Sequence, residues 1–300
     1  MMPPFLKSGD MVQIVSPASA IHPSYVEGAK RTLSEWNLKV LEGKYARSAY
    51  GRFAGTKEER IFDLQQALDD PEVKAIFMSR GGYGLVQIID KINFEQFKKS
   101  PKWLIGFSDI SILHAAVNRM GIASVHGIMA KHLAELPATS DAVFHLREIL
   151  FGRLPVYQLP FHPLNRQGKI TAKLLGGNLS VLMGLRGTSF DLPFEDAVLF
   201  VEDTGEKPYQ VDRMIQNLRI GGIFEKISGL IVGQFTDYES DPLMMQTIEE
   251  MFAEAVKNYS YPVCFNFPAG HIDYNLPLLL GENITLEVSA ENVLVDFNRQ

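Results

Sequence analysis

The feature that most constrains the fold is a regular alternation of short apolar segments and amphipathic segments over the first 126 residues. The apolar segments are rich in β-branched and large side chains, which is typical of buried strands, and apolar residues recur at helical spacing between them. Such alternation predicts an α/β fold in which helices cover both faces of a doubly wound parallel sheet. We expect its strands at residues 11–15, 38–41, 73–78, 103–106 and 123–126.

Polar or glycine-rich loops follow four of these strands, beginning at Ser16, Arg80, Ser108 and His126. The carboxyl ends of parallel strands meet at one edge of a sheet, and ligands of such sheets bind beyond that edge. The four loops therefore predict a functional site there.

The texture of the sequence changes after residue 153. Residues 154–168 contain three prolines and few helical patterns, which is typical of a linker. We therefore expect an N-terminal domain over residues 1–153 and a C-terminal domain of mixed α+β structure over residues 169–300. Alternating apolar residues near the end of the chain predict a β-hairpin in the second domain.

Composition narrows the function classes. The 300 residues are 46% apolar and 21% charged, which is ordinary for a globular protein with a sizeable core. A net charge of −6 argues against nucleic acid as a partner. The single cysteine, Cys264, excludes an internal disulfide and is expected to be an inert core thiol. The N-terminus lacks the apolar core of a signal peptide and no segment has membrane-spanning length, so we expect a cytoplasmic protein.

The strand at residues 103–106 turns sharply into a helix, and Ser108 lies at the corner. One interpretation is an N-cap, with the serine oxygen accepting an N–H of the first turn and Asp109 favoured by the helix dipole. The other is a nucleophile on a tight turn, with Gly106 allowing the bend and the helix N-terminus stabilising an oxyanion. The turn alone leaves both open.

A serine nucleophile needs a base and a carboxylate that orients the base. His271 is the best candidate for the base because it lies in a Pro/Gly-rich loop after a strand, although a solvated loop histidine has the same signature. Glu202 ends an apolar strand, where a carboxylate needs a partner, and an ion pair with Arg213 would also satisfy it. Its neighbour Asp203 is interpreted as a solvated turn residue.

Residues 80–84 (Arg-Gly-Gly-Tyr-Gly) are consistent with a tight turn that needs positive φ. They also allow backbone N–H groups to approach a ligand closely, as an oxyanion hole or an anion nest. The run matches neither a dinucleotide-binding nor a Walker motif, and the chain has no metal-binding motif. We therefore expect no cofactor and no metal.

Five motifs, in order and spacing, resemble those of the LD-carboxypeptidases, a family of serine peptidases that also includes the microcin-immunity peptidases. They are Arg80-Gly81-Gly82-Tyr83-Gly84, Gly106-Phe107-Ser108-Asp109, Gly176-Gly177-Asn178-Leu179, Val201-Glu202-Asp203 and Gly270-His271. Residues 51–56, with Glu59 and Arg60 after them, look like the family's upstream segment. The resemblance covers essentially the full chain.

The resemblance implies a cytoplasmic homodimer that removes the terminal D-alanine from the tetrapeptide stem of recycled peptidoglycan. Ser108 matches the nucleophile, Glu202 the orienting acid and His271 the base. The backbone N–H groups of Gly82 and Asp109 would form the oxyanion hole. The further substrate-binding candidates are Arg80, Gly81, Tyr83 and Asn178.

Two alternatives stay open at this point. A microcin-immunity peptidase, which cleaves an amide between an acidic residue and a modified nucleotide, would use the same triad and differ only in its pocket, for which residues 130–137 and 235–245 are candidate linings. A non-catalytic small-molecule binding protein would explain the glycine loops but not the presence of all three triad members.

Overall fold

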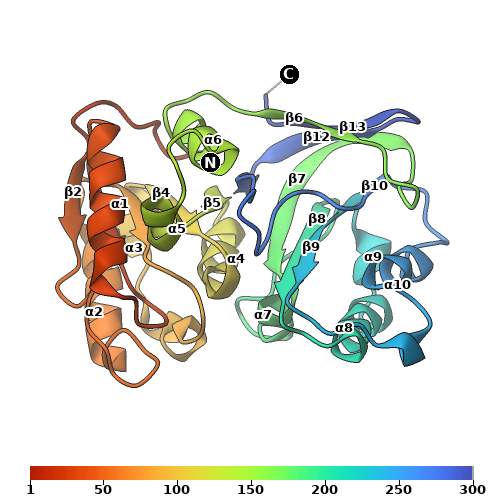
Figure 1. Ribbon diagram of the computed structural model, residues 1–300, viewed down its shortest axis with the longest axis horizontal. Coiled ribbons are helices and arrows are strands. Elements are labelled where there is room, and N and C mark those ends of the chain that lie inside the picture. Colours follow the sequence, from red (N-terminus) through yellow and green to blue (C-terminus); the bar gives the residue numbers. More distant parts are fainter. Residues whose placement is uncertain (299–300) are drawn as a thin grey trace.

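The structure, a computed structural model, describes residues 1–298 and contains two β-sheets side by side, each covered by helices (Figure 1). The first sheet has the order β11-β5-β4-β3-β1-β2, and its five N-terminal strands are parallel. These are β1 (Met11–Val15), β2 (Lys39–Glu42), β3 (Val73–Met78), β4 (Trp103–Gly106) and β5 (Ser124–His126).

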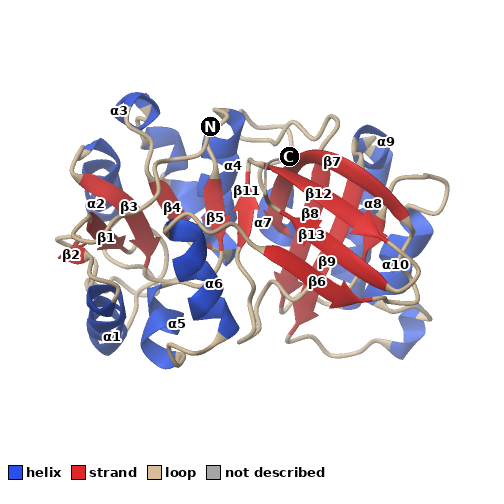
Figure 2. Cartoon of the chain, turned by 90° about the horizontal axis from the view of Figure 1, so that it is seen from above, coloured by secondary structure: helices blue, strands red, loops and turns tan. Residues whose placement is uncertain are grey.

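Helices cover both faces of this sheet, so the doubly wound architecture is confirmed. Figure 2 shows helices on both faces. One face carries α1 (Pro23–Glu35), α5 (Ala130–Glu135) and α6 (Asp141–Leu150), and the other carries α2 (Lys57–Asp69), α3 (Glu95–Lys99) and α4 (Ser111–Arg119). Short 3-10 helices η1 (Leu85–Gln87), η2 (Ile89–Lys91) and η3 (Ser108–Ile110) complete this half.

The strand order places a topological switch between β1 and β3, where the connections leave toward opposite faces. Loops at such a point open a crevice at the carboxyl ends of the strands. The two strand ends are tied together there, because the Ser16 and Ser79 hydroxyls lie 2.6 Å apart. The Gly-rich loop over residues 80–84 starts at this crevice.

The second sheet is mixed, with the order β10-β9-β8-β7-β12-β13-β6. Its parallel part is β7 (Gly168–Asn178), β8 (Val198–Thr204), β9 (Gly229–Thr236) and β10 (Val263–Cys264), and its antiparallel part is β12 (Asn283–Val288), β13 (Asn292–Asp296) and β6 (Val156–Pro160). The predicted C-terminal hairpin is thus β12–β13. The helical elements of this half are α7 (Leu179–Met183), α8 (Pro208–Ile220), α9 (Ile223–Lys226), η4 (Pro242–Met244) and α10 (Ile248–Ala255).

Two segments join the halves differently from a simple linker. Residues 154–168, expected as a linker, contain β6 at the edge of the second sheet. Strand β11 (Leu278–Leu280), from the C-terminal half, pairs antiparallel with β5 in the first sheet. Directly after it, the Gly281 N–H donates to the Leu174 carbonyl on β7 at 2.8 Å. Backbone hydrogen bonds therefore fix the two halves relative to each other.

Local signals explain several helix positions. A capping box starts α2, with Thr56 and Glu59 each accepting the other's backbone N–H. The segment after the Gly-rich loop forms the two 3-10 turns η1 and η2 and no α-helix. Cys264 is fully buried, and burial raises the pKa of its thiol to about 12, as expected for an inert core residue.

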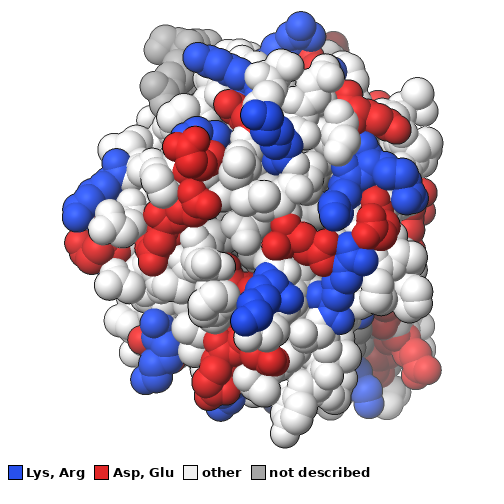
Figure 3. All heavy atoms as spheres, turned by 90° about the vertical axis from the view of Figure 1, so that its left-hand side faces the viewer, with Lys and Arg blue, Asp and Glu red and all other residues white. Residues whose placement is uncertain are grey.

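Acidic and basic side chains are interspersed on the face formed by α1, α2 and β2 (Figure 3). On this face the net charge of −6 therefore does not gather into a patch of one sign. No helix within residues 1–298 combines the length and the apolar character needed to cross a membrane.

Candidate active site

The turn between β4 and α4 holds Ser108 in a left-handed backbone conformation, with φ of 66°. Such a φ is uncommon for a residue other than glycine and costs free energy. The corner therefore lies at Ser108, as expected, and the positive φ falls on the serine and not on Gly106. Gly106 is needed for packing, because a Cβ there would lie 3.0 Å from the Ile110 side chain.

The N-cap interpretation of Ser108 is wrong. Neither η3 nor α4 has a side-chain cap, and the half-buried Ser108 hydroxyl forms no hydrogen bond with any group in residues 1–298. A strained, accessible and unbonded hydroxyl is consistent with a functional role, since backbone strain clusters at such sites.

His271 and Glu202 form a pair at the carboxyl end of β8. The Nδ1 atom of His271 lies 2.8 Å from Oε2 of Glu202, whose side chain is fully buried. Gly270 allows the loop to approach, because a Cβ at its φ of 134° would lie 3.0 Å from the same carboxylate oxygen. The alternative ion pair with Arg213 does not form, because the Arg213 guanidinium lies over the Tyr209 ring.

This pair lies against the turn that carries the serine. The His271 ring packs edge-on against Phe107, the residue before Ser108, with 4.8 Å between ring centroids. The His271 side chain is 20% exposed, so it reaches solvent while its partner does not. The structure thus brings a loop of the C-terminal half to the nucleophile candidate of the N-terminal half.

Opposing effects act on the protonation of His271. Burial disfavours the imidazolium, but the hydrogen bond to Glu202 and its negative charge favour it, and Asp203 and Asp237 add to this. The net result raises the pKa of His271 above its ordinary value of 6.5. Since Glu202 holds Nδ1, the Nε2 atom is left to act as a base.

The Gly-rich loop lies directly against Ser108. A Cβ on Gly81 would lie 2.8 Å from the Ser108 Cβ, so only glycine allows this approach. Gly82 follows with φ of 99°. Asp109, the next residue, is buried, and its carboxylate accepts the Leu85 N–H at 2.8 Å. Burial raises the pKa of Asp109 to about 6.

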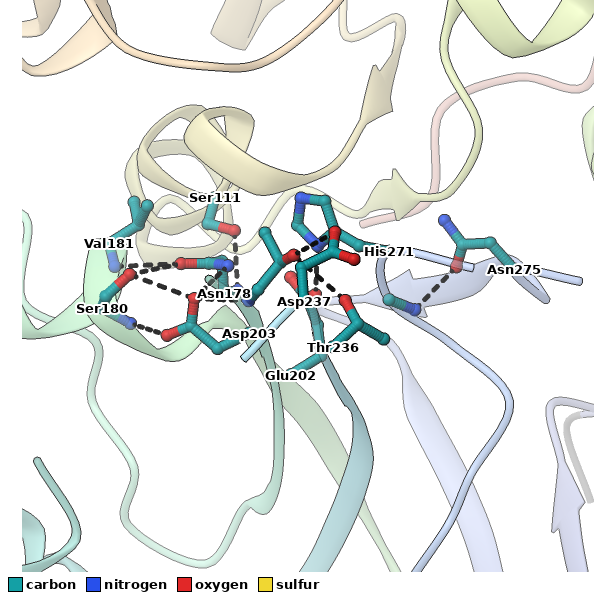
Figure 4. A network of polar contacts seen from close by, with 12 residues as sticks. Ser111, Asn178, Ser180, Val181, Glu202, Asp203, Thr236, Asp237, His271 and Asn275 are labelled. Carbon is teal, nitrogen blue, oxygen red and sulfur yellow. Dashed lines mark hydrogen bonds and ion pairs between the residues drawn. The ribbon is translucent and has the colours of Figure 1, made fainter. Parts of the chain in front are cut away.

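A buried polar network joins the two halves beside the histidine–glutamate pair (Figure 4). The Asn178 N–H donates to Ser111 Oγ on α4 at 2.9 Å, and Asn178 Nδ2 donates to Asp203 Oδ1 at 2.9 Å. Ser180 N–H donates to the other Asp203 oxygen. Asp203 is 1% exposed, so its interpretation as a solvated turn residue is wrong. Burial, with the nearby Glu202, raises its pKa to about 6.

The other candidates occupy varied positions. Arg80 is exposed, and Tyr83, 43% exposed, packs on the Phe53 ring. The buried Asn178 also caps α7, so its side chain is fully engaged within the protein.

His126 and His132 also pack against Phe107. His126 is fully buried between Phe107 and Phe200, and neither ring nitrogen has a partner in residues 1–298. The His132 ring lies 5.3 Å from that of Phe107, and no pattern in the sequence indicates this position.

Asp237 was also missed, although it directly follows the end of β9 (Figure 4). Residues 1–298 contain no cluster of His, Cys, Asp and Glu able to hold a metal.

Comparison with known proteins assigns the family. The model of the LD-carboxypeptidase N-terminal domain matches residues 12–127, and that of the C-terminal domain matches residues 171–286. The chain is 30% identical over 301 residues to a probable murein peptide carboxypeptidase of Bacillus subtilis, covering 98% of this chain and 94% of the relative. It is 30% identical over 289 residues to the murein tetrapeptide carboxypeptidase of Pseudomonas aeruginosa, covering 92% of each chain.

Solved structures with a similar fold agree with this family assignment. The muramoyltetrapeptide carboxypeptidase of Oxalobacter formigenes superposes with a TM-score of 0.89 at 25% identity, covering 96% of this chain and 99% of that one. The microcin C7 self-immunity protein, in complex with aspartyl sulfamoyl adenosine, gives 0.88 at 19% identity, covering 99% of each chain, and shows the shared fold alone. These matches leave no support for a non-catalytic binding protein. The chain belongs to the LD-carboxypeptidase family and is a serine-type carboxypeptidase.

Proposed function

We propose that this carboxypeptidase removes the terminal D-alanine from the murein tetrapeptide, with Ser108 as nucleophile, His271 as base and Glu202 as the acid that orients it. The observation that carries the proposal is the 2.8 Å contact between His271 Nδ1 and Glu202 Oε2, on a ring that packs against the residue before Ser108. The names of the two relatives in Bacillus and Pseudomonas support the choice of a murein peptide as substrate.

The reaction follows from this arrangement. Ser108 Oγ attacks the carbonyl carbon of the L,D bond, and its proton passes to His271 Nε2. The carbonyl oxygen becomes an oxyanion that accepts hydrogen bonds from the backbone N–H groups of Gly82 and Asp109. Collapse of the tetrahedral intermediate breaks the C–N bond, and His271 returns the proton to the departing D-alanine amine. Water, deprotonated by the same histidine, then hydrolyses the acyl-serine and releases the tripeptide.

A carboxypeptidase substrate ends in a free carboxylate next to the scissile bond. Arg80 is the cation on the loop that touches Ser108, and its exposed guanidinium is held by the Ala20 carbonyl at 3.2 Å. We assign it to the D-alanine carboxylate, with Gly81 and Tyr83 lining the same side. Asn178, which is buried and fully bonded, is assigned to positioning the domains instead of binding the substrate.

The proposal includes the setting that the family resemblance implies. The enzyme acts on recycled peptidoglycan stems in the cytoplasm and forms a homodimer. Sedimentation of the purified protein checks the dimer, because a single species with the mass of one chain contradicts it.

A substrate panel tests the proposal. The purified protein is incubated with the stem tetrapeptide in its diaminopimelate and lysine forms, with the same peptide ending in L-alanine, with the pentapeptide, and with aspartyl sulfamoyl adenosine. Mass spectrometry measures the products. We expect loss of one alanine from the tetrapeptide ending in D-alanine and a rate at least tenfold lower for the L-alanine form. Preferential cleavage of the nucleotide amide would instead identify a microcin-immunity-type peptidase.

A further inference from the structure

The Gly-rich loop is held in place from two sides. At its start, Ser19 N–H donates to the Gly81 carbonyl at 3.3 Å, and the Tyr83 N–H donates to Ser19 Oγ at 3.1 Å. At its end, the Leu85 N–H donates to the buried Asp109 carboxylate. Between these contacts, the Gly84 carbonyl points into the protein and accepts a hydrogen bond from Arg60 at 2.8 Å.

Arg60 lies on the first turns of α2 and is 1% exposed. Its Nη1 atom donates to the Pro17 carbonyl at 3.1 Å as well as to Gly84, and its Nη2 atom donates to Gln87 Oε1 at 3.0 Å. Its guanidinium lies 4.8 Å from the centre of the Phe53 ring. One side chain thus joins the loop after β1, the upstream segment at residues 51–56, the end of the Gly-rich loop and the 3-10 turn that follows it.

Stability alone does not account for this arginine. No carboxylate of residues 1–298 lies within ion-pair distance of it, and its Nε–H is buried without a partner. A buried cation without a paired carboxylate costs free energy that an apolar side chain of similar volume would avoid. The contact with Phe53 and the negative charge of the nearby Asp109, which is outside ion-pair distance, offset part of that cost. What the guanidinium provides instead is a planar fork with several donors, which fixes two carbonyls in one geometry.

We propose that Arg60 is a positioning residue for the oxyanion hole: it fixes the Gly84 carbonyl and thereby holds the Gly81–Gly82 backbone against Ser108. Arg60 touches neither substrate nor Ser108 and acts through the loop. The assignment rests on the proposed roles of Ser108 and the Gly82 N–H. It gives the upstream segment of the chain, which contributes no reacting group, a function in the reaction.

The first test compares two conservative substitutions. In Arg60→Lys one ammonium replaces the planar fork, so the Gln87 contact made through Nη2 is lost and the Gly84 carbonyl is no longer held in the plane of the fork. We therefore expect kcat to fall by about 10- to 100-fold while KM changes by less than about threefold. The matched control is Arg166→Lys. Arg166 also donates to backbone carbonyls, those of Val256 and Tyr259, and lies over a tyrosine ring, but at the opposite end of the second sheet. We expect its kcat to stay within about twofold of wild type.

The second readout separates positioning from a merely structural role. A tetrapeptide with a thioamide at the scissile bond develops charge on sulfur, which an oxyanion hole stabilises poorly. The ratio of the rates on the oxo and thio substrates therefore reports the quality of the oxyanion hole. We expect this ratio to fall about tenfold in Arg60→Lys and to be unchanged in Arg166→Lys. Equal loss of both rates in Arg60→Lys would overturn the proposal.

A substrate-independent measurement keeps this test apart from the proposed function. A fluorophosphonate labels an activated serine through an oxyanion-like centre, and intact mass gives the labelling rate of Ser108. If wild type is labelled but does not cleave the tetrapeptide, the proposed substrate is wrong. The role of Arg60 is then tested by the labelling rate of Ser108 alone, which we expect to be about tenfold lower in Arg60→Lys than in wild type. Labelling of Arg60→Lys at the wild-type rate would overturn the positioning role of Arg60. If wild type is neither labelled nor able to cleave the tetrapeptide, the roles of both Ser108 and Arg60 are overturned.

A milder variant covers the case in which Arg60→Lys does not fold. Gln87→Ala keeps the arginine and removes one of its anchors. We expect the same direction of change, a two- to threefold lower oxo/thio ratio, with an unaltered melting temperature serving as the fold control. An unchanged ratio in a folded Gln87→Ala, together with unfolded Arg60→Lys, would mean that Arg60 serves stability only.

Discussion

The imidazole of His271 lies with Nδ1 2.8 Å from the Glu202 carboxylate, although 69 residues separate the two in the chain. The strand β8 brings the glutamate to the edge of the second sheet, and the loop after β10 brings the histidine over it. The His271 ring also packs edge-on against the ring of Phe107, the residue before Ser108. The proposed reaction depends on this relationship between an oriented imidazole and a strained serine.

Replacing the orienting acid should slow the reaction without unfolding the protein. In Glu202→Gln the amide no longer selects the Nδ1–H tautomer or stabilises the imidazolium, so we expect kcat to fall by about 10²- to 10⁴-fold. Steady-state release of D-alanine measures it. Glu195→Gln, which removes only an exposed ion pair with Lys226, is the control and should behave as wild type. Wild-type rates in Glu202→Gln would refute the role of this carboxylate.

The pH profile follows from the raised pKa of His271. A general base must be neutral, so kcat/KM should rise with pH through a pKa above the ordinary value of about 6.5. Without the Glu202 charge, burial dominates, and the acid limb of Glu202→Gln should move to lower pH. The rates of both proteins from pH 5 to 9 check this. A limb at the same pH in both would show that another group controls the profile.

The raised pKa of His271 also makes the free energy of unfolding depend on pH. Because the folded-state pKa of His271 lies above the unfolded value of about 6.5, the stabilisation from its pairing is fully present below that pH. It is lost as the pH rises through the folded-state pKa. Other titrating groups also change the free energy of unfolding with pH. The difference in this free energy between wild type and Glu202→Gln, measured by urea unfolding at several pH values, isolates the contribution of the pair.

Much of the first half could be predicted from local patterns. The strand predicted at residues 73–78 matches the structure because the burial pattern that specifies a strand acts within a few residues. Strand β6 was missed because its prolines suggest a linker, yet proline is tolerated at a sheet edge, where β6 lies. Strand β11 has three residues, too few for periodicity, and its partner β5 is far away in the sequence.

The candidate site could be predicted in its residue types but not in its geometry. The motifs indicated Ser108, Glu202 and His271 through the resemblance and placed the corner at Ser108, but they did not indicate that the serine itself takes a positive φ. The structure places the strain on the serine, with φ of 66°. The burial of Arg60 and Asp203 likewise depends on contacts between distant segments, which no local pattern reveals.

The strained serine gives a prediction on stability. Ser108→Ala and Ser108→Gly both remove the hydroxyl, but only glycine adopts positive φ freely, so the glycine variant should be more stable by about 1 kcal/mol. Urea unfolding measures the difference. At Arg31, exposed in the middle of α1, the same comparison should have the opposite sign, with glycine less stable by about 1 kcal/mol. Equal stability of the two Ser108 variants would contradict the strain.

The contact between the halves gives a further prediction. A Cβ on Gly177 would lie 2.5 Å from Ser111 Oγ, so Gly177→Ala should cost about 2–3 kcal/mol and lower kcat by displacing α4. Gly187→Ala is the control: its φ of 75° is also positive, but nothing lies within 4 Å of its Cβ position. It should cost about 1 kcal/mol and leave kcat unchanged. If both variants lose equal stability, the halves are not packed this closely at Gly177.

The most direct test of the central claim measures D-alanine released from the stem tetrapeptide by wild type and by Ser108→Ala at equal, verified folded concentration. We predict one D-alanine and one tripeptide per tetrapeptide with wild type, and a fall in kcat of at least about 10³-fold in the variant. A variant that retains kcat within about tenfold of wild type would contradict the assignment of Ser108 as the nucleophile.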